Sequence, residues 1–272
     1  MLPYINILEY NIPMYGILIA AGILIANIAV FLMIKKNNDC MDDMIILEGY
    51  GLIGGFVGAK LMYLLILLNH ISLSTLFQGK NIFLVINGGF VFYGGLILGI
   101  PVAVLGGKIH HIPSTDYLKK YIFAVPLVHA FGRIGCFCAG CCYGMPYSGI
   151  GAVNFPSNSF APHDTLLFPI QLLESSLLFL LASTLYVFSQ RNKFSYNPEL
   201  YFFLYGLIRI ITELFRFDSI RGIYKGLSTS QYISLFLILI SFLSVLLRKL
   251  NHSQDFLHRI GKNYFKVHME PK

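Results

Sequence analysis

The chain has 272 residues, of which 56% are hydrophobic and only 12% are charged, and its mean hydropathy is +0.68. Soluble globular domains contain roughly 25% charged residues, so this composition excludes an ordinary soluble protein. The net charge of +7 does not indicate nucleic-acid binding, because Lys and Arg are scattered at segment ends and form no basic face. We therefore expect the lipid bilayer, and no nucleic acid, as a partner.

Apolar stretches recur along the chain at lengths that suit membrane crossing, since a helix needs about 20 apolar residues to cross a bilayer. The first is long and has no small-residue cleavage site after it, so we interpret it as a retained span and not as a signal peptide. We predict an all-α polytopic membrane protein with about seven transmembrane helices. The expected spans lie near 13–34, 44–68, 88–105, 121–137, 166–188, 200–217 and 230–247. They form one transmembrane domain over 1–250, followed by a basic tail over 251–272.

Positive charges alternate between the loops in a way that predicts orientation. If the N-terminus is outside, the inner side collects Lys35, Lys36, Lys108, Lys119, Lys120, Arg191, Lys193, Arg248, Lys249, Arg259, Lys262, Lys266 and Lys272. The outer loops keep Lys80, Arg221 and Lys225. The positive-inside rule then predicts an outer N-terminus and a cytoplasmic C-terminus in a plasma membrane.

Glycines concentrate in the second and third expected spans, for example Gly51 and Gly55, then Gly94, Gly95 and Gly99. Small residues at four-residue spacing let helix backbones approach closely. We expect most of these glycines to pack helices, although a glycine-rich patch also leaves room for acyl chains.

The sixth stretch contains four polar residues, Tyr205, Arg209, Glu213 and Arg216, at spacings that predict a single helix face. An Arg or Glu at the bilayer centre costs on the order of 2.5 to 3.5 kcal/mol, so this face needs a polar cavity or partner charges. Two interpretations remain open. The cluster either binds an anion or is an internal ion pair that only fastens helices.

Arg133 lies near the outer end of the fourth stretch, between Gly132 and Gly135. The planar guanidinium group suits a phosphate, to which it donates two parallel hydrogen bonds. The alternative is an arginine that extends to the membrane interface.

The fifth stretch opens with Gln171 and Glu174, three residues apart and on one face. Glu174 is a candidate general base or a counter-ion for one of the arginines.

Four cysteines, Cys136, Cys138, Cys141 and Cys142, fall within seven residues, while Cys40 stands alone. Their spacing does not match a standard zinc pattern, and no second Cys pair completes one, so we expect no metal site. A disulfide and simple packing are the other interpretations.

The chain contains four distinctive blocks, which are GGFVFYGGLILG (Gly88 to Gly99), GRIGCFCAGCCYG (Gly132 to Gly144), FPIQLLE (Phe168 to Glu174) and YGLIRIITELFRFD (Tyr205 to Asp218). In this order they resemble the signature blocks of the prolipoprotein diacylglyceryl transferase family. The segments MYG (Met14 to Gly16) and GLSTSQYIS (Gly226 to Ser234) are also similar, so the resemblance covers nearly the whole chain.

The resemblance implies a bacterial plasma-membrane enzyme whose helices surround a lipid-binding cavity. Such an enzyme moves the diacylglyceryl group of phosphatidylglycerol to the lipobox cysteine thiol of a preprolipoprotein, next to its signal peptide. The products are a thioether and glycerol phosphate, and neither a metal nor an organic cofactor is implied. The alternatives are a related transferase with another acceptor and a non-enzymatic phospholipid transporter.

By position, the resemblance implies that Arg133 contacts the phosphatidylglycerol headgroup and that Arg209 is the second required arginine. We assign catalytic roles to Arg209, Glu213, Tyr93 and Glu174, and substrate-binding roles to Arg133, Arg216, Tyr205, Tyr15, Gln171 and Gly144. The thiolate is the attacking nucleophile, and the candidate bases are, in falling order, Glu213, Glu174 and Tyr93.

Three positions depart from the family pattern. Tyr93 stands where the family often has His, and Cys136 and Cys141 stand where it usually has Asn and Glu. Tyr is a poor base near neutral pH, and the two cysteines remove polar groups beside the headgroup arginine.

Overall fold

A computed structural model describes residues 3–7, 10–68, 89–191, 193, 195–217 and 223–268, of which 7, 10, 223–224 and 251–268 are described by their backbone alone. Lys80, Arg221 and Lys272 of the orientation prediction lie outside the described residues, as does the first residue of the expected third span, 88.

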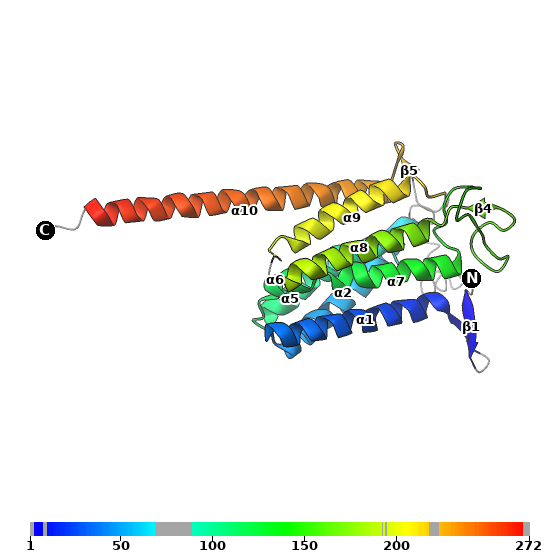
Figure 1. The fold of residues 1–272 in the computed structure, drawn as a ribbon, viewed down its shortest axis with the longest axis horizontal. Helices are drawn as coiled ribbons and strands as arrows, with labels where there is room; N and C mark the ends of the chain where they lie inside the picture. Colours follow the sequence, from blue (N-terminus) through cyan, green and yellow to red (C-terminus); the bar gives the residue numbers. More distant parts are fainter. Residues whose placement is uncertain are drawn as a thin grey trace. The chain divides into compact units, whose positions relative to one another are not determined.

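The described chain is mainly helical (Figure 1). The helices are α1 Met14–Asn37, α2 Met41–Leu68, α5 Phe92–Ile109, α6 Ser114–Tyr121, α7 Ala124–Ala139, α8 Ile170–Gln190, α9 Asn197–Glu213 and α10 Thr229–His268. The described residues also form three antiparallel two-stranded pairs: β1 Tyr4–Ile7 with β2 Tyr10–Pro13 before α1, β3 Val153–Asn154 with β4 Leu166–Leu167 between α7 and α8, and β5 Ile223–Tyr224 with β6 Leu227–Ser228 between α9 and α10.

Five described helices are long and apolar enough to cross a membrane, namely α1, α2, α5, α8 and α10 as far as Leu250. A sixth is added if α6 and α7 count as one broken span. Pro126 explains why α7 begins afresh at Ala124, because proline has no N–H to donate to the preceding turn. The prediction of an all-α polytopic membrane protein is confirmed.

The count of seven spans stays a prediction, because it depends on α9. This helix has 17 residues, which corresponds to a length of about 26 Å, and it includes Glu199, Arg209 and Glu213. Its length and composition alone therefore do not identify it as a span.

The chain divides into two compact units, one over 24–124 and the other over 1–23 and 125–272. In the first unit, α2 and α5 meet through glycines, as the sequence predicts. A Cβ atom on Gly54 would lie 2.6 Å from Cβ of Val102, and one on Gly99 would lie 3.1 Å from the carbonyl oxygen of Gly51. These helix backbones approach closely because there are no side chains between them.

In the second unit, α8 packs against α9 and α9 packs against α10, so the three run side by side (Figure 1). Gly206 permits the second contact, because a Cβ there would lie 2.7 Å from Cγ1 of Ile238. The start of α1 packs on α7 in a similar way, where a Cβ on Gly135 would lie 2.9 Å from Cδ2 of Tyr15.

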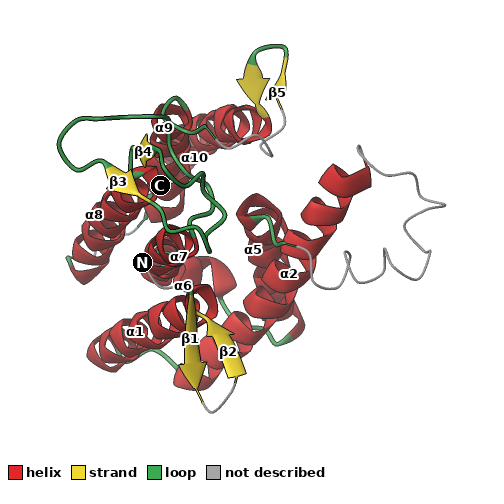
Figure 2. Ribbon diagram, turned by 90° about the vertical axis from the view of Figure 1, so that its right-hand side faces the viewer, coloured by secondary structure: helices red, strands yellow, loops and turns green. Residues whose placement is uncertain are grey.

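Backbone hydrogen bonds connect the ends of α7, α8 and α9 in this unit. The N–H of Met145 donates to the carbonyl of Phe215 at 2.9 Å, and the N–H of Phe168 donates to the carbonyl of Met145 at 3.0 Å. The β3–β4 hairpin lies at the same end (Figure 2), over a small core of Phe155, Ala161 and Leu167. Three polar helix ends are thus held next to one another.

Candidate active site

Glu174, in the second turn of α8, is shared by two arginines from different helices. Arg133 of α7 donates from Nη2 to Oε2 of Glu174. Arg209 of α9 donates from Nη1 to Oε1 at 2.9 Å and to Oε2 at 3.1 Å. The Glu174 side chain is 0% exposed, so its charge is stabilised by these two guanidinium groups and not by water.

The network continues from Arg209 to the end of α9. Nη2 of Arg209 lies 3.2 Å from Oε2 of Glu213, and Nη1 of Arg216 lies 3.5 Å from the same oxygen. The expectation that Arg216 shares the helix face of Arg209 is wrong, because α9 ends at Glu213. Arg216 instead forms a β-bridge with Gly144 and reaches Glu213 from outside the helix.

The start of α10 adds a hydroxyl group to this network. Ser228 accepts from the N–H of Gln231 at 3.2 Å, and the Gln231 side chain accepts from the N–H of Ser228 at 2.9 Å. This reciprocal pair is a capping box, which determines where the helix begins. It places Ser230 so that its Oγ donates to Oε2 of Glu213 at 2.7 Å.

The network's charges do not cancel. Three arginines and two glutamates leave one positive charge on these five residues, whose side chains are all 10% exposed or less. In addition, no described residue accepts a hydrogen bond from Nε of Arg133. The structure therefore contains the internal ion pairs of the second interpretation. The excess positive charge also leaves the network suited to bind an anion.

Tyr205 and Tyr15 lie at the edges of this region. Tyr205 is 1% exposed, and its ring makes an edge contact with His129 at 5.5 Å between centroids. Tyr15 is 39% exposed and packs against Gly135, two residues from Arg133.

Gln171 and Gly144 join the loops to the helices. Nε2 of Gln171 donates to the carbonyl of Cys141 at 2.8 Å. Gly144 lies so close to the carbonyl oxygen of Phe168 that a Cβ atom would clash with it. Both residues therefore hold backbone segments in place, whatever else they contact.

Tyr93 is the one predicted site residue outside this unit. It is 5% exposed near the start of α5, in the unit over 24–124. Its role beside the arginines stays a prediction.

Sequence reasoning missed two residues near the network, His129 and Ser230. His129 stands four residues before Arg133, a spacing that places both on one face of α7. Ser230 follows Ser228 in an S-x-x-Q capping pattern, which is a detectable helix-start signal. Neither pattern identifies the contact of His129 with Tyr205 or that of Ser230 with Glu213, because both contacts join different helices.

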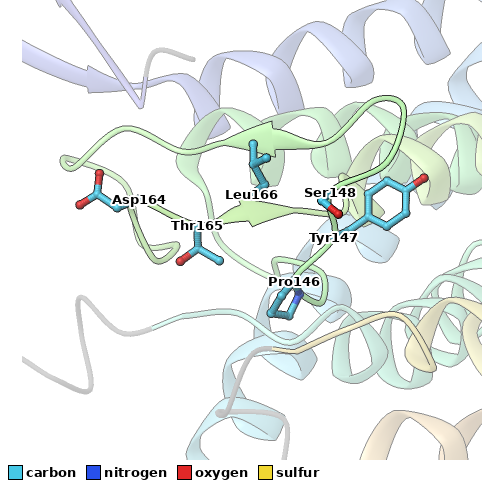
Figure 3. A pocket seen from close by; sticks show the side chains of 6 residues that line it. All are labelled: Pro146, Tyr147, Ser148, Asp164, Thr165 and Leu166. Carbon is cyan, nitrogen blue, oxygen red and sulfur yellow. The ribbon is translucent and has the colours of Figure 1, made fainter.

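An open pocket of about 620 Å³ lies beside the β3–β4 hairpin, within the same unit. Figure 3 shows its lining residues, Pro146, Tyr147, Ser148, Asp164, Thr165 and Leu166. They include none of the predicted site residues. The lipid-binding cavity around the arginines stays a prediction.

The fold and this site define a polytopic membrane protein with a buried, positively charged arginine–glutamate network. A sequence model described as prolipoprotein diacylglyceryl transferase matches residues 3–247. The chain therefore belongs to the prolipoprotein diacylglyceryl transferase family.

Bacterial relatives are similar over most of their length. A phosphatidylglycerol–prolipoprotein diacylglyceryl transferase of Clostridium tetani is 37% identical over 227 residues, which cover 83% of this chain and 89% of the relative. A second relative of that name, numbered 2, from Clostridium perfringens is 32% identical, with 86% and 90% covered. The transferase of Finegoldia magna is 28% identical, with 86% and 90% covered.

We expect Glu174→Gln to destabilise the protein strongly, because it leaves two buried guanidinium groups without their shared carboxylate. Loss of one partner from a buried ion pair costs about 3–5 kcal/mol. Thermal unfolding in detergent measures the effect. The control is Asp116→Asn, which removes the exposed pair of Asp116 with Lys119 at 2.9 Å and should change stability by about 1 kcal/mol or less. Equal effects of the two substitutions would contradict the structural role of Glu174.

Proposed function

We propose that Arg133 and Arg209 bind the phosphate of phosphatidylglycerol and stabilise it as it leaves during diacylglyceryl transfer. The chain is a diacylglyceryl transferase by family, and its relatives are named for phosphatidylglycerol and prolipoprotein. Those two molecules are its substrates, and it acts in a bacterial membrane. The observation that supports the arginine roles most directly is that both guanidinium groups converge on one buried carboxylate.

The reaction breaks one bond and forms another. The thiolate sulfur of the lipobox cysteine attacks the glyceryl carbon that carries the phosphate ester, so a C–S bond forms while the C–O bond breaks. The electron pair of the C–O bond leaves with the phosphate oxygen, and glycerol phosphate is released. Negative charge therefore grows at the phosphate. Fixed cations in a low-dielectric site stabilise such charge best, because they need no reorganisation during the reaction.

Glu174 positions the arginines and does not take the thiol proton. Both of its oxygens accept from guanidinium groups, and its side chain is fully enclosed. Glu213 is the better candidate base, because it lies at the end of α9, where the chain leaves the helix. Tyr205, Tyr15, Gln171 and Arg216 complete the proposed lipid-binding set, and Gly144 holds Arg216 through the backbone.

Replacing Arg133 or Arg209 by Ala should reduce transfer of labelled lipid to a lipobox peptide by about 10²–10³-fold, because each removal takes away a transition-state donor. The control is Arg248→Ala, since Arg248 pairs with Glu199 near the start of α9, at the other end of this unit. Size-exclusion chromatography in detergent confirms that each variant is folded. Transfer at the wild-type rate by both folded variants would exclude the proposed roles.

Glu213→Gln should lower transfer at pH 7 by about 10²–10⁴-fold if Glu213 accepts the thiol proton. The deficit should shrink as the pH rises above about 8.5, where the acceptor thiol ionises without help. The pH profile of kcat/KM measures this recovery. Glu199→Gln, on the same helix, is the matched control and should keep the wild-type profile. A deficit that is constant with pH would assign Glu213 a purely structural role.

The orientation belongs to the same proposal, with the N-terminus outside and the C-terminus cytoplasmic. The network then lies toward the outer face, because it is formed at the C-terminal ends of α7 and α9 and the N-terminal end of α8. Arg191 and Arg248 lie toward the opposite ends of α8 and α9, on the proposed inner side.

A reporter fused to the C-terminus tests this orientation. Green fluorescent protein should fluoresce there, since it folds in the cytoplasm, and alkaline phosphatase should be inactive, since it needs the outer compartment. Active phosphatase with dark fluorescent protein would reverse the proposed topology without affecting the chemistry.

A further inference from the structure

Three cysteine sulfurs meet at the end of α7, next to the arginine network. The Sγ atoms of Cys136, Cys141 and Cys142 all lie within 4.8 Å of one another. Cys136 is buried and the other two are partly buried. The proposed function uses none of these thiols.

The helix end accounts for two of the three. The N–H of Cys141 donates to the carbonyl of Cys136 at 3.1 Å, and the N–H of Gly140 donates to the carbonyl of Phe137 at 3.2 Å. These bonds form a Schellman motif, with Gly140 in the left-handed region at φ +73°. The motif brings the side chain after the glycine back onto the last turn of the helix, so Cys141 meets Cys136.

The position of the third sulfur depends on an unfavourable backbone conformation. Cys142 has a φ of +54°, which for a residue other than glycine costs on the order of 1–2 kcal/mol. Packing of a small apolar side chain does not require this conformation. The conformation does allow two consecutive cysteines to direct their sulfurs to one place.

The spacing suits shared coordination better than a disulfide. A Zn–S bond of about 2.3 Å corresponds to sulfurs roughly 3.8–4.0 Å apart around one ion. A disulfide needs two sulfurs about 2.05 Å apart and gives the third no role. Three sulfurs that all lie within 4.8 Å of one another are compatible with such a spacing.

The local charge also suits a divalent cation. Three thiolates carry a charge of −3, and one divalent ion reduces it to −1, so the ion lowers the electrostatic cost of holding the thiolates together. Nη1 of Arg133 lies 3.9 Å from Sγ of Cys136, so the two groups are in contact.

We propose that Cys136, Cys141 and Cys142 bind a thiophilic divalent cation of the Zn²⁺ class. The three thiols release three protons to solvent and form three metal–sulfur bonds, with no change in oxidation state. The prediction of no metal relied on zinc patterns with two Cys pairs, and a site of three thiolates does not need a second pair. The ion joins the last turn of α7 to the residues that follow it, one turn from Arg133. Gln171 of α8 donates to the carbonyl of Cys141 in the same segment.

Cd²⁺ titration of the metal-free, reduced full chain in detergent tests the proposal. We expect thiolate-to-cadmium charge-transfer absorption that saturates at one ion per chain. Cys136→Ser, Cys141→Ser and Cys142→Ser should each lose this band. Cys138→Ser and Cys40→Ser are matched controls, since their sulfurs are outside the three-sulfur cluster, and should retain it.

A second measurement on the wild-type chain does not depend on how the variants fold. Mass spectrometry measures the extent of maleimide labelling at each cysteine. Bound Cd²⁺ should reduce the labelling of Cys136, Cys141 and Cys142 and leave that of Cys138 unchanged. Absence of the band, a band that survives all three substitutions, or protection of Cys138 in place of Cys142 would overturn the proposal. None of these results depends on transferase activity, so the metal-site proposal and the proposed transfer mechanism can be refuted independently.

Discussion

The carboxylate of Glu174 holds guanidinium groups from two other helices, and the arrangement of the site depends on this shared ion pair. Arg133 and Arg209 come from α7 and α9, while Glu174 lies between them on α8. Burial makes the interaction strong and also makes it costly to leave incomplete. The five charged residues therefore form one electrostatic unit, in which Glu174 and Glu213 orient the arginines without neutralising them all.

This incomplete neutralisation connects the architecture with the chemistry. A fully balanced network would fasten helices and offer little to an anionic substrate. Under the proposed function, a network with one excess positive charge, which is costly in an apolar environment, becomes balanced when the phosphodiester of the lipid binds. Backbone hydrogen bonds of Met145 and the β-bridge of Gly144 hold the helix ends in place around the network.

The cysteine cluster shows which contacts a linear pattern leaves out. In the sequence, Cys136, Cys141 and Cys142 match no standard zinc spacing. In the structure, a Schellman motif and one left-handed residue bring their sulfurs together beside Arg133. Spacing rules assume a particular local backbone, and two residues with positive φ are enough to change which side chains meet.

The sequence by itself determined the membrane class, the apolar helices and the polar residues that lipid would not tolerate without partners. These follow from composition and helical periodicity, which are local properties. Only the tertiary structure decided that Glu174 serves both arginines, that Arg216 lies beyond the end of α9, and that Ser230 contacts Glu213. Such contacts join residues far apart in the chain, and they depend on where each helix ends and which helices pack together. No local pattern contains that information.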